Sequence, residues 1–439
     1  MTRLSTLERR KRDGIRDGFD QKKDRIASNV FYCLFVFLPI VESINGYING
    51  GGNEGGLSLG IAYRLILACA CLAILAHYGL DRKKLIIVPL AIIVLVLPHI
   101  LEIVANGNAK GGVSFPALWL KTFLPILCIE AYRSMLLKDR SLDDLQERLF
   151  NVWTLLFPLC MLVPYVFGLG FNTYGEDGAG YKAFFFSQND ICFALVVLYA
   201  YSFFKMLQNP TISFVVRTLL LVACIILLGL KSGYILLLTL TVFFLLRDGS
   251  VSVGRRLLIL LFAIFAFLLV LNVFSEQIEA VIARWEYFST VLGDFIRFAT
   301  SARIDRVPMA LSYLSGGDQN GSWILFGSGL EYSKALGSYA LIEMDFFDML
   351  FLFGVLGLTF YVTYYVRLYR SSSKNGTRSL YLSTAFWSAF VMAFLAGHVL
   401  VNSALSAMVF SAICCGLVSS SVNSQGDKKQ CKTNARIER

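Results

Sequence analysis

Long apolar blocks, separated by short polar connections, run through most of this sequence. Each block approaches the roughly 20 residues that a helix needs to cross ~30 Å of hydrocarbon. Only helices or closed barrels satisfy their backbone hydrogen bonds there, and the alternating pattern of barrel strands is absent. We therefore expect an all-α polytopic membrane protein. The spans, about twelve by this criterion, are predicted near residues 29–46, 57–79, 84–104, 113–133, 149–170, 184–206, 212–230, 232–246, 257–274, 344–368, 379–399 and 401–419.

Basic residues gather in both tails and in alternate connections, for example Arg82-Lys83-Lys84, while the intervening connections contain few. Because an excess of Lys and Arg marks the cytoplasmic side, we expect both termini in the cytoplasm. The net charge of +10 then reflects topology and the lipid bilayer as partner, with no nucleic acid needed. The expected organisation is a basic cytoplasmic tail at 1–28, helices at 29–274, a large loop at 275–343, helices at 344–419 and a basic cytoplasmic tail at 420–439.

The large loop, 275–343, falls on the outer side in this topology, although it is not free of cations. Long loops cross the membrane largely regardless of charge, so these cations leave the topology unchanged. The stretch from Ser275 to Phe298 is amphipathic and aromatic, which favours a folded lid over a disordered linker. The cations of the loop are Arg284, Arg297, Arg303, Arg306 and Lys334.

Motifs for nucleotides and metals are absent from the sequence: it contains no P-loop, no dinucleotide fingerprint and no HExxH. Its three histidines, His77, His99 and His398, are scattered, and most of its cysteines lie in apolar blocks. Cysteines in that setting act as small apolar residues. We expect neither a cofactor nor a metal site.

Ionisable residues inside the predicted spans carry more information, since charges at such depth are costly and usually functional. One interpretation is a set of structural ion pairs between helices. The other is an outward-facing cavity with Arg64 and Lys121 at its floor, which Arg303 and Arg306 of the loop would complete as an anion site. Arginine suits phosphate because its planar fork donates two parallel hydrogen bonds. The buried ionisable residues are Glu42, Arg64, Glu102, Lys121, Glu130 and Asp190.

Several short motifs, in order, resemble the O-antigen polymerase and ligase superfamily. Phe185-Phe186-Ser187-Gln188-Asn189-Asp190 is similar to its helix entry, and Leu230-Lys231-Ser232-Gly233 to an outer turn. Ser301-Ala302-Arg303 resembles a segment of its large periplasmic loop. The exit from that loop resembles Gly327-Ser328-Gly329, Glu343-Met344-Asp345 and Phe353-Gly354-Val355-Leu356-Gly357, and the final turn resembles Gly397-His398.

The resemblance implies a membrane-embedded, metal-independent glycosyltransferase of GT-C-like fold in the bacterial inner membrane. Such a polymerase of the Wzy type joins oligosaccharide repeat units carried on undecaprenyl pyrophosphate at the periplasmic face, and a chain-length regulator would be a further membrane partner. Two alternatives stay open. One is the sister ligase, which passes glycan to the lipid A core, and the other is a flippase for lipid-linked oligosaccharides.

Site roles follow from this resemblance. Arg303, Arg306, Arg64 and Lys121 would bind the pyrophosphate, whose charge grows in the transition state. A general base is expected among Asp345, Glu343 and His398. Glu343 and Asp345 could instead cap a helix, and His398 could simply pack. Asn189, Asp190 and Lys231 are further candidates, although Asn189 and Asp190 would also serve as hydrogen bonds between helices.

Overall fold

The computed structural model describes residues 24–50, 58–79, 96, 100, 114–139, 142–174, 179–247, 254, 261, 268, 272, 274–316, 321–337, 341–373 and 379–437. The predicted span near 84–104, with His99 and Glu102, lies outside the described residues except at two positions. So do residues 1–23 and most of the predicted span near 257–274.

Every other predicted span coincides with a helix. The first is bent by 44° between helix Asp24–Val36 and α2 (Leu38–Ile48), where Pro39 cannot donate a backbone hydrogen bond. The others are α3 (Leu59–Tyr78), α5 (Ser114–Leu136), α6 (Leu145–Val166), α7 (Gln188–Gln208), α8 (Ile212–Leu228), α9 (Lys231–Arg247), α15 (Asp345–Ser373), α16 (Leu380–Leu395) and α17 (Ser406–Ile437).

Some of these helices are long and apolar enough to span a membrane. Within the described residues four helices, α3, α6, α7 and α15, are long and apolar enough to cross a membrane, or five spans if the bent pair counts as one. Three shorter apolar helices accompany them: Ile212–Leu228, Leu380–Leu395 and Ser406–Val422. The chain is thus a mostly helical protein with membrane-capable helices, and a total of about twelve spans stays a prediction.

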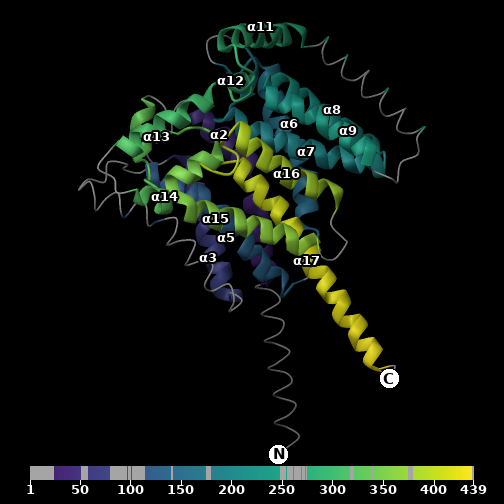
Figure 1. Ribbon diagram of the computed structural model, residues 1–439. Helices are drawn as coiled ribbons and strands as arrows, with labels where there is room; N and C mark the ends of the chain where they lie inside the picture. The colour runs from purple at the N-terminus through teal and green to yellow at the C-terminus, as the bar shows by residue number, and fades with distance from the viewer. Residues whose placement is uncertain are drawn as a thin grey trace, which may run out of the picture.

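Helix α7 forms the centre of the bundle. In its apolar stretch 94% of residues are buried, and it packs against α6, α8, α9, α16 and α17 (Figure 1). A two-stranded antiparallel hairpin, β1 (Phe171–Asn172) and β2 (Tyr181–Ala183), leads into its N-terminus. Ser187 caps α7 by accepting a hydrogen bond from the Asp190 amide at 3.4 Å. This cap fixes the direction in which residues 187–190 leave the hairpin.

The predicted lid consists largely of short helices where the structure describes it. These are α11 (Ser275–Leu292), α12 (Phe295–Ala299), η3 (Arg303–Asp305), α13 (Arg306–Gly316), α14 (Ser322–Phe326) and η4 (Glu331–Leu336). In Figure 1, α11 lies at the top, far from the C-terminal end of α17 at the lower right. Folded structure in this segment agrees with the sequence analysis, while its position on the periplasmic side stays a prediction.

Helix α15 breaks at Gly354, whose φ of 68° and ψ of −175° suit only glycine. A side chain there would lie 2.3 Å from the carbonyl oxygen of Leu325. The break frees the carbonyls of Phe351 and Leu352, which accept hydrogen bonds from the amides of Ser328 and Gly329 at 2.7 and 3.3 Å. The two glycine motifs of the sequence therefore join the lid to α15 by backbone contact.

Candidate functional site

An open cleft with a cavity volume of about 190 Å³ lies where the N-terminus of α7, the lid and the loop before α17 meet. Six of the ten candidate residues from the sequence line it: Lys121, Asn189, Asp190, Arg303, Glu343 and His398. Its remaining lining residues are Glu42, Phe185, Phe186, Ser187, Gln188, Asn402, Ala404 and Leu405. The cleft thus collects segments that lie up to 363 residues apart in the chain, from Glu42 to Leu405.

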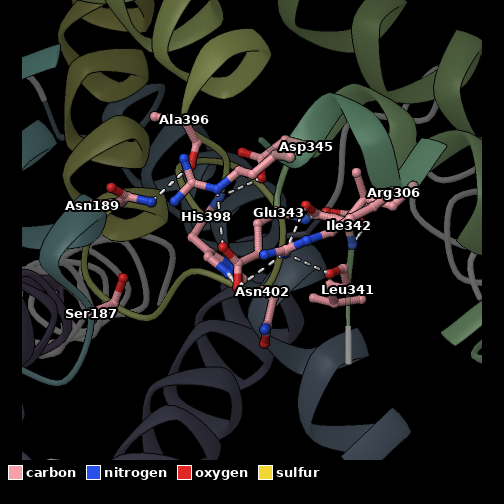
Figure 2. A network of polar contacts seen from close by, with 12 residues as sticks. Ser187, Asn189, Arg306, Leu341, Ile342, Glu343, Asp345, Ala396, His398 and Asn402 are labelled. Atoms are coloured by element: carbon pink, nitrogen blue, oxygen red, sulfur yellow. Dashed lines mark hydrogen bonds and ion pairs between the residues drawn. The ribbon is translucent and has the colours of Figure 1, made fainter. Parts of the chain in front are cut away.

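Glu343 is the centre of an ion-pair cluster on the cleft wall (Figure 2). Its carboxylate lies 3.0 Å from Nε of Arg303, 3.6 Å from Nη1 of Arg306 and 3.8 Å from Nε2 of His398. The side chains of Arg303 and Arg306 are 13% and 14% exposed. At this burial a charge needs partners, and one carboxylate serves two arginines and, when the histidine is protonated, His398.

Arg306 also holds the backbone next to Glu343. Its Nη1 donates to the carbonyl oxygens of Leu341 and Ile342 at 3.4 and 3.2 Å. This arginine therefore fixes the strand of loop that presents Glu343, besides adding positive charge to the site.

Asp345 and Asp348, at the start of α15, are buried and bind backbone amides. Asp345 accepts hydrogen bonds from the amides of His398, Val399 and Leu400 at 2.6, 2.9 and 2.6 Å. Asp348 accepts from the amides of Ile342 and Glu343 at 2.8 and 3.0 Å. One carboxylate therefore orders the His398 loop and the other orders the Glu343 loop.

Backbone strain gathers in the two loops that these aspartates hold. Glu343, His398 and Asn402 have positive φ angles of 66°, 55° and 55°, a region costly for residues with a side chain. At Gly397 a side chain would lie 2.0 Å from the carbonyl oxygen of Glu343. Direct backbone packing thus brings His398 and Glu343 to the same wall.

The electrostatics of the cluster favour the ionised form of Glu343 and the protonated form of His398. Burial alone would raise the pKa of Glu343, but the hydrogen bond and charge of His398, together with Arg303 and Arg306, hold that pKa well below its usual range. Burial alone would lower the pKa of His398, but Glu343, Asp345 and Asp190 outweigh it and raise the pKa above the usual 6.5. Glu343 is therefore a carboxylate at neutral pH and a weak base.

Lys121, Asn189 and Asp190, three of the candidates from the sequence, line the cleft. Lys121 Nζ lies 3.5 Å from the Asn402 side-chain oxygen. Asn189 donates to the Ala396 carbonyl oxygen at 2.8 Å. Asp190 accepts from the Ala404 amide at 3.1 Å and from the Ser406 hydroxyl at 2.9 Å. The two α7 residues are therefore engaged in holding the loop before α17.

Arg64 and Lys231 lie apart from the ion-pair cluster. Arg64 pairs with Glu42 at 2.7 Å, with both side chains at most 5% exposed, and Glu42 in turn lines the cleft. Lys231 donates to the Phe298 carbonyl oxygen at 2.6 Å and lies 3.8 Å over the Phe298 ring. Lys231 thereby holds the segment that leads to Arg303.

The sequence analysis missed several residues that build the site. Asp348 lies one helical turn after Asp345, and that spacing was the available signal. Ser187, Gln188 and Asn402 line the cleft without any charge to mark them. Within the described residues no group of three His, Cys, Asp or Glu side chains is arranged to hold a metal ion.

Comparisons of the sequence with models of known protein families and with curated proteins found no match.

Proposed function

We propose that this chain is a glycosyltransferase that polymerises oligosaccharide repeat units carried on undecaprenyl pyrophosphate, at the outer face of the inner membrane. The observation that carries the proposal is the ion-pair cluster of Arg303, Arg306, Glu343 and His398 on the wall of an open cleft. Three of the resembling motifs contribute to it: Ser301-Ala302-Arg303, Glu343-Met344-Asp345 and Gly397-His398. Helices long and apolar enough to cross a membrane are compatible with a substrate whose lipid tail stays in the bilayer.

The arginines suit the leaving group. Pyrophosphate gains negative charge as its bond to the sugar breaks, and fixed cations in a water-poor site stabilise that charge. Arg303 and Lys121 line the cleft. Arg306 does not line it, but it adds positive charge through its ion pair with Glu343 and is, like Arg303, less than one-fifth exposed. Bidentate hydrogen bonds from arginine match phosphate oxygens.

The reaction is a displacement at the anomeric carbon of the growing chain. An acceptor hydroxyl oxygen forms the new glycosidic bond, the bond to the pyrophosphate oxygen breaks, and the lipid pyrophosphate leaves with the electron pair. The hydroxyl proton passes to a base. Of the three candidates, Asp345 is engaged by three amides and Glu343 by two arginines, so we assign this role to His398, which lines the cleft.

The test is a complementation assay in the host strain that lacks the gene, with gel analysis of its surface polysaccharide. Variants Arg303→Ala and His398→Ala should leave single repeat units in place of long chains, with rates of elongation at least about 10²-fold lower. Lys334→Ala is a matched control, because Lys334 is a half-exposed cation of the same loop whose ion pair with Glu331 lies outside the cleft.

Two outcomes would contradict the proposal. Normal-length chains from both variants would remove the cleft from the chemistry. Loss of all glycan from the lipid A core, single units included, would favour the ligase over the polymerase.

A further inference from the structure

We infer that the wall of the cleft formed by Ser187, Gln188 and Asn402 is a saccharide subsite that binds hydroxyl groups of the acceptor sugar; the inference rests on the proposed polymerase function. These three residues, two with a side-chain amide and one with a hydroxyl, are called the amide wall below. They line the same cleft as Arg303 and His398 and carry no charge.

The polar groups of Ser187, Gln188 and Asn402 are only partly used in hydrogen bonds to other described residues. No described residue contacts the Gln188 side-chain amide by a hydrogen bond, and the Asn402 side chain engages only its oxygen, with Lys121 at 3.5 Å. Ser187 accepts from the Asp190 amide, which leaves its own hydrogen available to donate. Each member of the wall is partly exposed in the cleft. The wall therefore offers neutral donors and acceptors to a ligand.

The chemistry of the amide wall suits the hydroxyl groups of a sugar. A sugar hydroxyl both donates and accepts, and side-chain amides and hydroxyls do the same. Neutral groups bind a neutral sugar without competing with pyrophosphate for the arginines. Phe186 adjoins the wall and lines the cleft, which provides an apolar surface for the C–H face of a sugar ring.

The position of the amide wall relative to His398 and the arginines also suits an acceptor sugar. Figure 2 shows Ser187 and Asn189 on one side of His398 and Glu343, with Arg306 on the other side. Asn189 ties the α7 end of this wall to the Ala396 carbonyl oxygen, so the wall is fixed relative to the His398 loop. A sugar on the amide wall and a pyrophosphate on the arginines would therefore meet at His398, where an acceptor hydroxyl must lose its proton.

The test uses the purified full-length protein in lipid nanodiscs and two binding probes. One probe is the free repeat-unit saccharide, released from the host's lipid carrier by mild acid. The other is undecaprenyl pyrophosphate without sugar. Gln188→Ala and Asn402→Gly should each weaken binding of the saccharide about three- to ten-fold, the value of one hydrogen bond. Both should leave binding of the lipid pyrophosphate unchanged. Glycine at 402 retains the positive φ of 55°.

Two controls make the result specific. Gln208→Ala changes the same residue type at the other, exposed end of α7 and should leave both probes unaffected. Arg303→Ala should weaken the lipid pyrophosphate more than the saccharide. Equal unfolding midpoints for wild type and variants exclude a general loss of folding.

Three outcomes would contradict the subsite, and a fourth would contradict the polymerase alone. Unchanged saccharide binding in both amide-wall variants, or equal weakening of both probes, would contradict the subsite. Wild-type protein that binds no free saccharide would contradict it as well. Wild-type protein that binds the saccharide but does not lengthen a lipid-linked chain would overturn the polymerase and leave a saccharide subsite in place.

Discussion

At the scale of single residues, the proposed polymerase function predicts that His398 and Glu343 set the pH dependence of elongation. His398 accepts a proton only when neutral, and its pKa is raised above the usual 6.5 because Glu343 and two aspartates outweigh burial. The rate should therefore rise with pH through a midpoint above 6.5. Glu343→Gln removes the main opposing charge, lowers the pKa of His398 and should shift this limb to lower pH. A pH–rate profile of purified protein measures the shift.

The control for this prediction is His77→Gln. His77 lies 3.6 Å from Asp24 and is 45% exposed, outside the cleft, so its loss should leave the profile unchanged. An identical acidic limb in wild type and Glu343→Gln would show that His398 is not the titrating base.

Asp345 provides a second prediction at this scale. Asp345→Ala would leave three backbone amides, those of residues 398–400, without their acceptor. Each buried unsatisfied donor costs about 1–3 kcal/mol, so both the unfolding midpoint and the activity should fall. Asp345→Asn, which keeps one carbonyl oxygen, should show a smaller loss of both. An inactive Asp345→Asn protein of wild-type stability would instead identify Asp345 as a reacting group.

The sequence predicted the types of residue at the site better than their partners. Arg303, His398 and Lys121 were identified from charge, depth and motif, and all three line the cleft. Their pairing with Glu343 could not be predicted, because Glu343 lies 40 residues from Arg303 and meets it only through the folded lid. Gln188 lies within the helix-entry motif but was not singled out as a site residue, because it carries no charge and an amide at a helix start is ordinary.

At the scale of elements, the joint between the lid and α15 depends on Gly354. Gly354→Ala should lower the unfolding midpoint strongly, because the new side chain would lie 2.3 Å from the Leu325 carbonyl oxygen. The matched control is Gly293→Ala, at a positive φ of 61° but with open space around it. That control should lose only the strain of its backbone, about 1 kcal/mol. Equal losses in the two variants would contradict a close-packed joint.

Helix positions were predicted well because apolar length alone marks them. The predicted 113–133 is α5, Ser114–Leu136, and the predicted 212–230 is α8, Ile212–Leu228. Helix ends were predicted less well, since apolar length does not show where a helix continues into polar sequence. The predicted end near 419, for example, lies inside α17, which continues as a helix to Ile437. The break at Gly354 was equally hidden, because a glycine in an apolar run reads as helix.

At the scale of the whole molecule, the prediction is one of orientation. From the basic tails and connections we predict that both termini lie in the cytoplasm and residues 275–343 outside. Single cysteines introduced at exposed positions 315 and 371 should react differently with a membrane-impermeant thiol reagent added to spheroplasts. Position 315 should label and position 371 should not. Labelling of 371 alone would reverse the topology and place the cleft on the cytoplasmic side.

The central claim is that the cleft of Arg303, Glu343 and His398 elongates a lipid-linked glycan. Its most direct test is turnover by purified protein in nanodiscs, supplied with the lipid-linked repeat unit isolated from the host. We expect products that grow by whole repeat units. The rate should be at least about 10²-fold lower for Arg303→Ala and unchanged for Lys334→Ala. Products of one repeat unit only from the wild-type protein, or equal rates for wild type and Arg303→Ala, would contradict it.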